Sequence, residues 1–301
     1  MPMGSNHDHD HSRMPAAPTK ALGIAFAITA VVFFGELAGG LISGSLALLS
    51  DAMHMLSDSA GLIIALVASI VGKRAASGRA TYGHRRIEVM AALINAVTVT
   101  GVVVWILVQA IGRVGGDHSI DTNVMLGVAL VGLVANAASA WVLSRAAGDS
   151  LNVRGALLHV MADMLGSVAV IVAAVVIKMT GWLAADTVAS LIIVALVLPR
   201  SLQLLWQSAE VLLERAPRGV DTQEIQESLE AVPGVLAVHD LHVWSTDGVT
   251  PLATCHIVVD GDNDISCGVL DRAQAKLREF GIEHSTIQLE TPDHQSHEHT
   301  C

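Results

Sequence analysis

Long apolar runs fill the first two thirds of the chain, and six of them are long enough to cross a membrane. A hydrocarbon core about 30 Å thick needs roughly 20 apolar residues in a helix. The six runs cover Lys20–Ile42, Ser45–Val71, Ile87–Ile111, Val124–Arg145, Leu151–Met179 and Trp182–Trp206. The pattern predicts a bundle of six transmembrane helices over residues 20–206. Within the last run, Pro199 is expected to kink the helix or to mark its exit.

The distribution of basic residues predicts how the bundle is oriented. The loop after the second run carries Lys73, Arg74, Arg79, Arg85 and Arg86, and the loop after the fourth is bounded by Arg145 and Arg154. The opposite side shows only Arg113 and Lys178. Basic loops face the cytoplasm. We therefore expect a multi-pass protein of the plasma membrane, a bacterial inner membrane, with both termini in the cytoplasm.

Beyond Trp206 the apolar runs give way to shorter segments that are typical of a small α/β domain. Asp221 caps a helical pattern that ends at Pro233-Gly234. The remaining predicted elements are strands at Val235–Ser245 and Thr250–Asp260, a helix at Cys267–Phe280 and a strand at Ser285–Glu290. This order predicts a cytoplasmic αββαβ domain over residues 207–291. The His-rich ends, residues 1–19 and 292–301, are expected to be disordered.

The composition agrees with an apolar body that carries an acidic tail. The chain is 52% hydrophobic and 15% charged, with a net charge of −11, whereas soluble domains average about 25% charged residues. Residues 207–301 hold 17 acidic and 5 basic residues. A nucleic-acid-binding protein would carry a basic patch, so we expect no nucleic-acid partner. The three cysteines all lie in the tail, and their odd number does not indicate a disulfide framework.

Ionisable residues inside two of the apolar runs point to function, because a charge at membrane depth is costly. His54 and Asp58 lie four residues apart in the second run, and His159 and Asp163 repeat this spacing in the fifth. The spacing places each pair on one helical face. If the two helices face each other, two imidazoles and two carboxylates form a tetrahedral site that suits Zn²⁺. Polar residues hydrogen-bonded within the bundle are the rival interpretation, but two identical pairs favour the metal site.

Four segments are similar to motifs of the cation diffusion facilitators, a family of proton-coupled exporters of zinc and other divalent metals. They are Ser45–Asp58, Tyr82–Glu88, Leu158–Asp163 and Val238–Trp244, and the resemblance covers Lys20–Thr291. It implies a homodimer that exchanges metal for protons by alternating access, with a metallochaperone-like tail that dimerises. It also implies a transport site at the positions of His54, Asp58, His159 and Asp163. In this family a histidine at the position of residue 54 accompanies a preference for zinc.

Two other acidic residues of the membrane body lie outside that four-ligand site. Asp51 shares the helical stripe of His54, and Glu36 interrupts the first run. Each is a candidate for a proton path or for a polar contact between helices, and the spacing leaves both interpretations open.

Further histidines are candidates for zinc sites outside the membrane body. In the tail, a regulatory zinc site could form from His239, His256, His284 and Glu290, with ordinary surface histidines as the rival interpretation. His239 and His242 are three apart in a strand and point to opposite faces unless a bulge intervenes. In the basic loop, His84 is either a solvated histidine or part of an accessory metal site. At the N-terminus, low-affinity zinc collection is expected of His7, His9 and His11.

Missing motifs narrow the class of function. The chain has no Gly-x-x-x-x-Gly-Lys-Ser/Thr loop, so nothing argues for ATP drive, and no His-Glu-x-x-His motif of a metalloprotease. A tight four-ligand site disfavours fast conduction, and His and Asp can take protons when metal leaves. We expect a zinc/proton antiporter of the lipid bilayer that is not an enzyme. A metal-sensing membrane receptor or a divalent-cation channel is the alternative.

Overall fold

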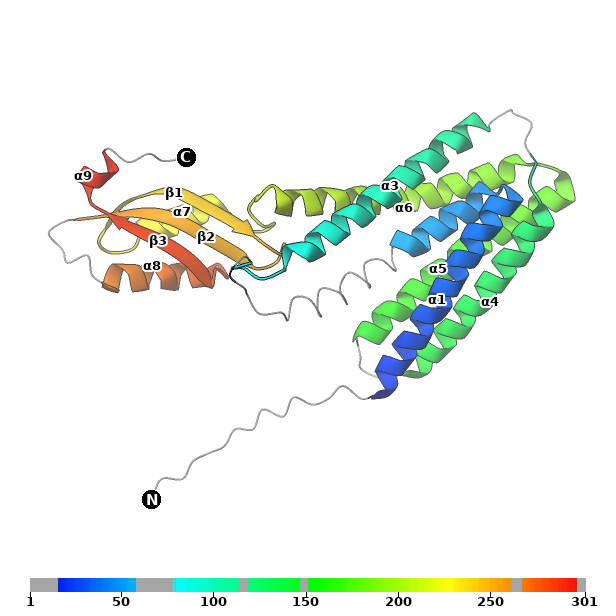
Figure 1. The fold of residues 1–301 in the computed structure, drawn as a ribbon, viewed down its shortest axis with the longest axis horizontal. Coiled ribbons are helices and arrows are strands. Elements are labelled where there is room, and N and C mark those ends of the chain that lie inside the picture. The colour runs from blue at the N-terminus through cyan, green and yellow to red at the C-terminus, as the bar shows by residue number, and fades with distance from the viewer. Residues whose placement is uncertain are drawn as a thin grey trace, which may run out of the picture. The chain divides into compact units, whose positions relative to one another are not determined.

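The computed structural model describes residues 16–57, 78, 80–113, 119–146, 151–260 and 267–296 (Figure 1). The chain divides into two compact units, one within residues 1–62 and 98–201 and the other within residues 63–97 and 202–301. The division passes through two helices, α3 (Arg86–Gly112) and α6 (Ala184–Leu212). The domain limits predicted after residues 19, 206 and 291 stay predictions.

Five helices are long and apolar enough to cross a membrane: Leu22–Ser43, Arg86–Gly112, Thr122–Arg145, Ala156–Thr180 and Ala184–Leu212. They belong to α1 (Ala16–Ser43), α3, α4 (Thr122–Ala146), α5 (Leu151–Thr180) and α6. Many of their large apolar side chains are exposed, as expected of helices surrounded by lipid. The second predicted span is described only as a helix over residues 46–57, so the six-span count stays a prediction.

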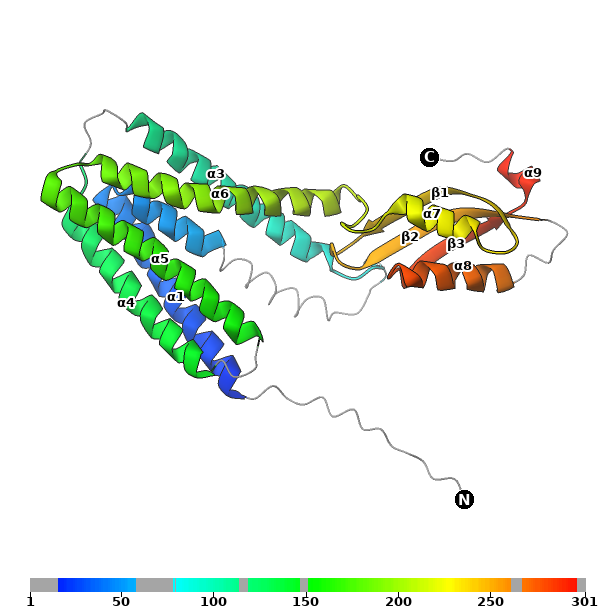
Figure 2. The same cartoon turned by 180° about the vertical axis from the view of Figure 1, so that it is seen from behind.

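Within the first unit, α4 packs along both α1 and α5, and the three helices lie side by side in both views (Figures 1 and 2). Buried side chains such as Leu48, Met125, Val170 and Ile193 form one core that joins the helix 46–57, α4, α5 and α6. This core holds the helix 46–57 and α5, which carry the predicted metal ligands, in one packed unit.

The helix α6 continues past Pro199 and ends at Leu212, six residues beyond the predicted limit at Trp206. Pro199 therefore does not end the helix, and its predicted role as a kink or as the exit of the span stays a prediction. Proline removes one backbone hydrogen bond, but in an apolar surrounding every other backbone group still needs a partner, which favours continuing the helix.

The tail consists of α7 (Thr222–Glu230), β1 (Val235–Ser245), β2 (Pro251–Val259), α8 (Cys267–Glu279), β3 (His284–Glu290) and α9 (Pro292–Gln295). Its mixed sheet has the order β1-β2-β3, with β1 and β2 antiparallel and β2 and β3 parallel. Figure 2 shows α7 and α8 on one face of this sheet. The short helix α9 lies in the segment for which the sequence predicts disorder, and so does the start of α1 at Ala16.

Local signals explain the ends of several tail elements. The carboxylate of Asp221 accepts hydrogen bonds from the amides of Gln223 and Glu224 at 2.9 and 3.3 Å, which confirms it as the cap of α7. Gly248, with φ +79°, supplies the turn between β1 and β2 that the sequence predicts at Asp247-Gly248.

Cys255 is buried in the core of the tail, and burial raises the pKa of its thiol to about 12. It packs in this core as a small apolar residue, as the sequence predicts.

Candidate metal sites

The helix 46–57 and α5 bring three of the four predicted transport-site residues together in the first unit. Asp163 Oδ1 lies 4.0 Å from His54 Nε2, and Asp163 Oδ2 lies 3.9 Å from His159 Nε2. Each carboxylate oxygen therefore faces one imidazole, and the two imidazoles come from different helices. Asp163 is buried, while the side chains of His54 and His159 keep exposed fractions of 12% and 23%.

Each of the two His–Asp separations, taken by itself, is close to the spacing of two ligands on one small cation. Zinc–ligand bonds of about 2.0–2.1 Å in a tetrahedron separate the ligand atoms by roughly 3.3 Å, so the observed distances are only slightly wider. The two imidazoles reach the site for different reasons. His159 lies one turn before Asp163 on α5, whereas His54 is brought there by the packing of the helix 46–57.

Asp58, the fourth predicted ligand, lies outside the described residues, so its position stays a prediction. The same is true of the N-terminal histidines His7, His9 and His11.

Two more carboxylates, Glu36 on α1 and Asp51 on the helix 46–57, are each only 1% exposed. Their oxygens have no hydrogen-bond partner among the described residues. Glycines make room for both: a Cβ atom at Gly132 would lie 2.7 Å from Glu36 Oε1, and one at Gly166 would overlap the Asp51 carboxylate. The sequence singled out both acids but not the two glycines, because a glycine in an apolar helix carries no signal of what it contacts.

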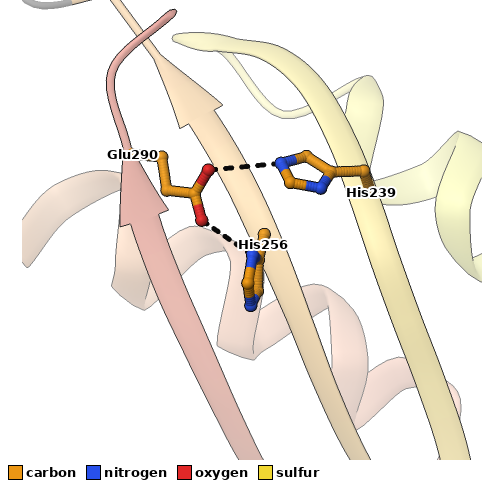
Figure 3. Close-up of side chains that lie close together, drawn as sticks. All are labelled: His239, His256 and Glu290. Carbon is orange, nitrogen blue, oxygen red and sulfur yellow. Dashed lines mark hydrogen bonds and ion pairs between the residues drawn. The ribbon is translucent and has the colours of Figure 1, made fainter. Parts of the chain in front are cut away.

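A second cluster lies in the tail, where the sheet brings together His239, His256 and Glu290 (Figure 3). Glu290 Oε2 lies 3.3 Å from His239 Nε2, and Glu290 Oε1 lies 2.7 Å from His256 Nδ1. His239 pairs directly with His256 across β1 and β2, and Glu290 pairs with Val258 on the neighbouring strand. Ligand atoms of all three lie within 4.8 Å of one another, so the cluster fits a single metal ion.

A bulge follows His239 in β1, where the register shifts before His242 and Asp240 adopts φ +51°. His242 stays exposed and places Nδ1 3.1 Å from the carbonyl oxygen of Asp240. His284, also predicted as a tail ligand, lies at the opposite end of β3 from Glu290, and its ring contacts Tyr82 with a centroid distance of 6.1 Å. The structure thus brings together three of the four predicted tail ligands and leaves His284 apart.

His84, the candidate in the basic loop, lies just before α3 and is half-buried. Its Nδ1 atom is buried and has no hydrogen-bond partner in the part of the chain that the structure describes. The neighbouring arginines do bind tail residues within the second unit: Arg85 pairs with Asp247 at 2.9 Å and Arg86 with Glu214 at 2.6 Å.

The chain matches two protein families along its length. Residues 22–213 match the cation efflux transmembrane domain, and residues 217–292 match the cytoplasmic domain of cation efflux proteins. Together the two matches cover both metal-ligand clusters.

Three relatives cover nearly the whole chain. The metal cation efflux system protein CzcD of Cupriavidus metallidurans is 41% identical over 289 residues, which are 96% of this chain and 90% of the relative. The cadmium, cobalt and zinc/H(+)-K(+) antiporter of Bacillus subtilis is 39% identical over 298 residues, 97% and 93% of the two chains. The zinc transporter ZitB of Escherichia coli is 39% identical over 292 residues, 96% and 93% of the two chains. The chain belongs to the cation efflux family, the cation diffusion facilitators.

Proposed function

We propose that the protein is a secondary active transporter that exports Zn²⁺ from the cytoplasm in exchange for protons. The observation that carries the proposal is the position of Asp163 between His54 and His159, with each carboxylate oxygen about 4 Å from one imidazole. Ionisable groups inside a membrane helix are costly, so their presence favours a functional site. The relatives named as a zinc transporter and as a cadmium, cobalt and zinc/H(+)-K(+) antiporter support the substrate class.

The donor set favours zinc as the transported ion. Two imidazole nitrogens and carboxylate oxygens suit a small tetrahedral divalent cation, and Asp58 would complete the set as the fourth ligand. Because two ligands are expected from each helix, a relative movement of the helix 46–57 and α5 would open or close the site. Such a movement is what alternating access requires.

Proton exchange follows from the same ligands, because histidine and aspartate must lose their protons to bind a metal ion and can take them up when it leaves. Glu36 and Asp51 are two further carboxylates that can take up and lose protons, and they lie outside the set of four ligands. Both are buried and lack hydrogen-bond partners among the described residues, and an ionised carboxylate in such a place is costly. We propose that they form part of the proton path.

In the tail, we propose that His239, His256 and Glu290 bind a regulatory zinc ion. Both imidazoles lie against a carboxylate whose side chain is fully buried, which leaves the ion a fixed anionic ligand. We also propose that the tail forms the homodimer contact, since the family of this domain points to dimerisation.

The proposed orientation places both termini in the cytoplasm of a bacterial inner membrane. The basic loops lie on the same side as the tail in the predicted topology, and the tail matches a domain described as cytoplasmic.

Zinc uptake into vesicles containing the purified protein tests the proposal. His54→Ala and Asp163→Ala should each reduce uptake to the level of protein-free vesicles, because each removes a ligand of the transported ion. The matched controls are His242→Ala, an exposed histidine outside both clusters, and Asp121→Ala, an acidic residue at the end of the bundle. Near-normal uptake by either ligand variant would contradict the proposed site.

A further inference from the structure

The carboxylate of Asp186, in the first turn of α6, binds the start of a different helix. It is fully buried and accepts three hydrogen bonds: from Ser45 Oγ at 2.6 Å, from the Leu46 amide at 2.9 Å and from the Ala47 amide at 3.1 Å. All three donors lie at the beginning of the helix 46–57, which carries His54.

The first amides of a helix have no partner within that helix, and inside a membrane each unpaired amide costs several kcal/mol. Such amides are usually capped by the residue just before the helix. Here the Ser45 hydroxyl accepts a hydrogen bond from the Leu48 amide at 3.1 Å. The Asp186 carboxylate accepts hydrogen bonds from the two preceding amides, those of Leu46 and Ala47. The helix 46–57 is therefore capped from α6, about 140 residues further along the chain.

Arg113 completes this arrangement at the end of α3. Its Nη1 atom lies 3.7 Å from Asp186 Oδ2 and donates a hydrogen bond of 2.7 Å to the carbonyl of Gly44. Gly44 has φ +73°, the left-handed conformation that ends α1. The guanidinium offsets the buried negative charge and ties a third helix to the same turn.

We propose that Asp186 is a positioning residue for zinc transport: by capping the helix 46–57 from α6, it sets where that helix begins and so where His54 meets Asp163. Leu46 and His54 are eight residues apart, about 12 Å along a rigid helix, so a displacement at the cap reaches the ligand. The inference rests on the proposed function, because it assumes that His54 binds the transported ion.

The test compares the zinc dependence of uptake for Asp186→Ala, Asp186→Asn, Ser45→Ala and the double variant Ser45→Ala/Asp186→Ala. Asp121→Ala is the matched control, because the Asp121 carboxylate caps its own helix α4 through the amides of Asn123 and Val124. Asp186→Ala should raise the KM for zinc about tenfold, the usual size of a lost cap, with a smaller fall in the maximal rate per inserted protein. Asp186→Asn, which keeps one acceptor oxygen, should show a smaller rise.

Two further readouts separate positioning from general instability. The KM effects of Ser45→Ala and Asp186→Ala should add to less than their sum in the double variant, because both remove the hydrogen bond between Ser45 and Asp186. Hydrogen exchange at the amides of residues 46–48 should be faster in Asp186→Ala and unchanged in Asp121→Ala.

An unchanged KM in both Asp186 variants, or an equal rise in Asp121→Ala, would overturn the positioning role. So would additive effects in the double variant. If Asp186→Ala does not insert into the membrane, Asp186→Asn carries the same comparison. A different result would contradict the proposed function itself. Normal zinc uptake by His54→Ala would refute the transport site, independently of the results for the Asp186 variants.

Discussion

The absence of a side chain at Gly132 in α4 leaves space for the buried carboxylate of Glu36. At Gly132 a Cβ atom would lie 2.7 Å from Glu36 Oε1, whereas at Gly127 on the same helix nothing lies within 4 Å. Gly132→Ala should lower the stability of the protein in detergent by about 1–3 kcal/mol, the usual cost of overpacking. It should also slow zinc uptake if Glu36 belongs to the proton path. Thermal unfolding and vesicle uptake measure the two effects.

Gly127→Ala is the matched control for this substitution. In open space the added methyl group favours the helix, so we expect unchanged or slightly higher stability and normal uptake. Equal effects of the two substitutions would show that the space beside Glu36 is unimportant.

The identity of residue 54 should set metal selectivity. Imidazole suits tetrahedral zinc, while a carboxylate accepts larger and more variable coordination. We expect His54→Asp to keep zinc uptake and to gain cadmium uptake relative to the parent protein. Paired uptake curves for the two metals, normalised to inserted protein, measure the ratio. An unchanged cadmium-to-zinc ratio would place selectivity elsewhere.

Among single residues, the sequence predicts those whose chemistry is unusual for their surroundings. His54, His159 and Asp163 stand out because ionisable groups are rare in apolar helices, and the structure brings the three together. Asp186 has no such signal of its role in the sequence. Two of its partners are the backbone amides of Leu46 and Ala47, and a backbone amide carries no sequence signal of what it binds.

Among the elements, the turn between β1 and β2 is held by one carboxylate. Burial alone would raise the pKa of Asp247, but hydrogen bonds from the Thr250 and Val249 amides, the Thr250 hydroxyl and Arg85 outweigh it, so the pKa is lowered. A carboxyl whose pKa falls on folding stabilises the folded state above its unfolded pKa, near 3.8. That stabilisation is lost as the pH falls through the lowered folded pKa.

Asp247→Asn should therefore reduce the free energy of unfolding at pH 7 by roughly 1 kcal/mol, allowing for solvent screening. The difference from the parent should narrow as the pH falls below 3.8. Thermal unfolding across this pH range measures it, with the exposed Asp271→Asn as control. A difference that is constant with pH would contradict the assignment.

A further prediction at the scale of the elements concerns the cluster of His239, His256 and Glu290 on the tail sheet. The double variant His239→Ala/His256→Ala should weaken zinc-dependent association of the tails and lower transport without abolishing it, because both ligands lie outside the membrane spans. Zinc-dependent sedimentation and vesicle uptake measure the two effects, and His242→Ala is the control. Complete loss of transport in a folded double variant would contradict a regulatory role.

Elements with a regular pattern are predicted well, and local departures from it are not. The alternation of β1 and the cap at Asp221 predict their elements to within a residue or two. The bulge at Asp240 has no such signal, because a left-handed aspartate depends on the pairing of β1 with β2. The helix α6 extends six residues beyond the predicted limit at Trp206, because the limit follows the apolar run and a helix can continue where the run ends.

At the scale of the whole molecule, the apolar composition and the spacing of basic loops predict a multi-pass membrane protein with an acidic tail, and the five apolar helices and both family matches agree. How the helices pack is less accessible from sequence. Outward-facing side chains in lipid are as apolar as buried ones, so hydrophobicity does not indicate which faces meet. For α5 and the helix 46–57, the ligand spacing predicts the face of each helix, and the contact between His54 and Asp163 is seen in the structure.

The central claim is that zinc and protons exchange through the site containing Asp163. The most direct test records zinc uptake and proton release together in vesicles with an imposed pH gradient, for the parent protein and for Asp163→Ala. We expect zinc to accumulate against its own gradient only while the pH gradient lasts, with a matching proton flux, and both fluxes to vanish in Asp163→Ala. Zinc entry that merely equilibrates regardless of the pH gradient, or exchange that survives in Asp163→Ala, would contradict the account.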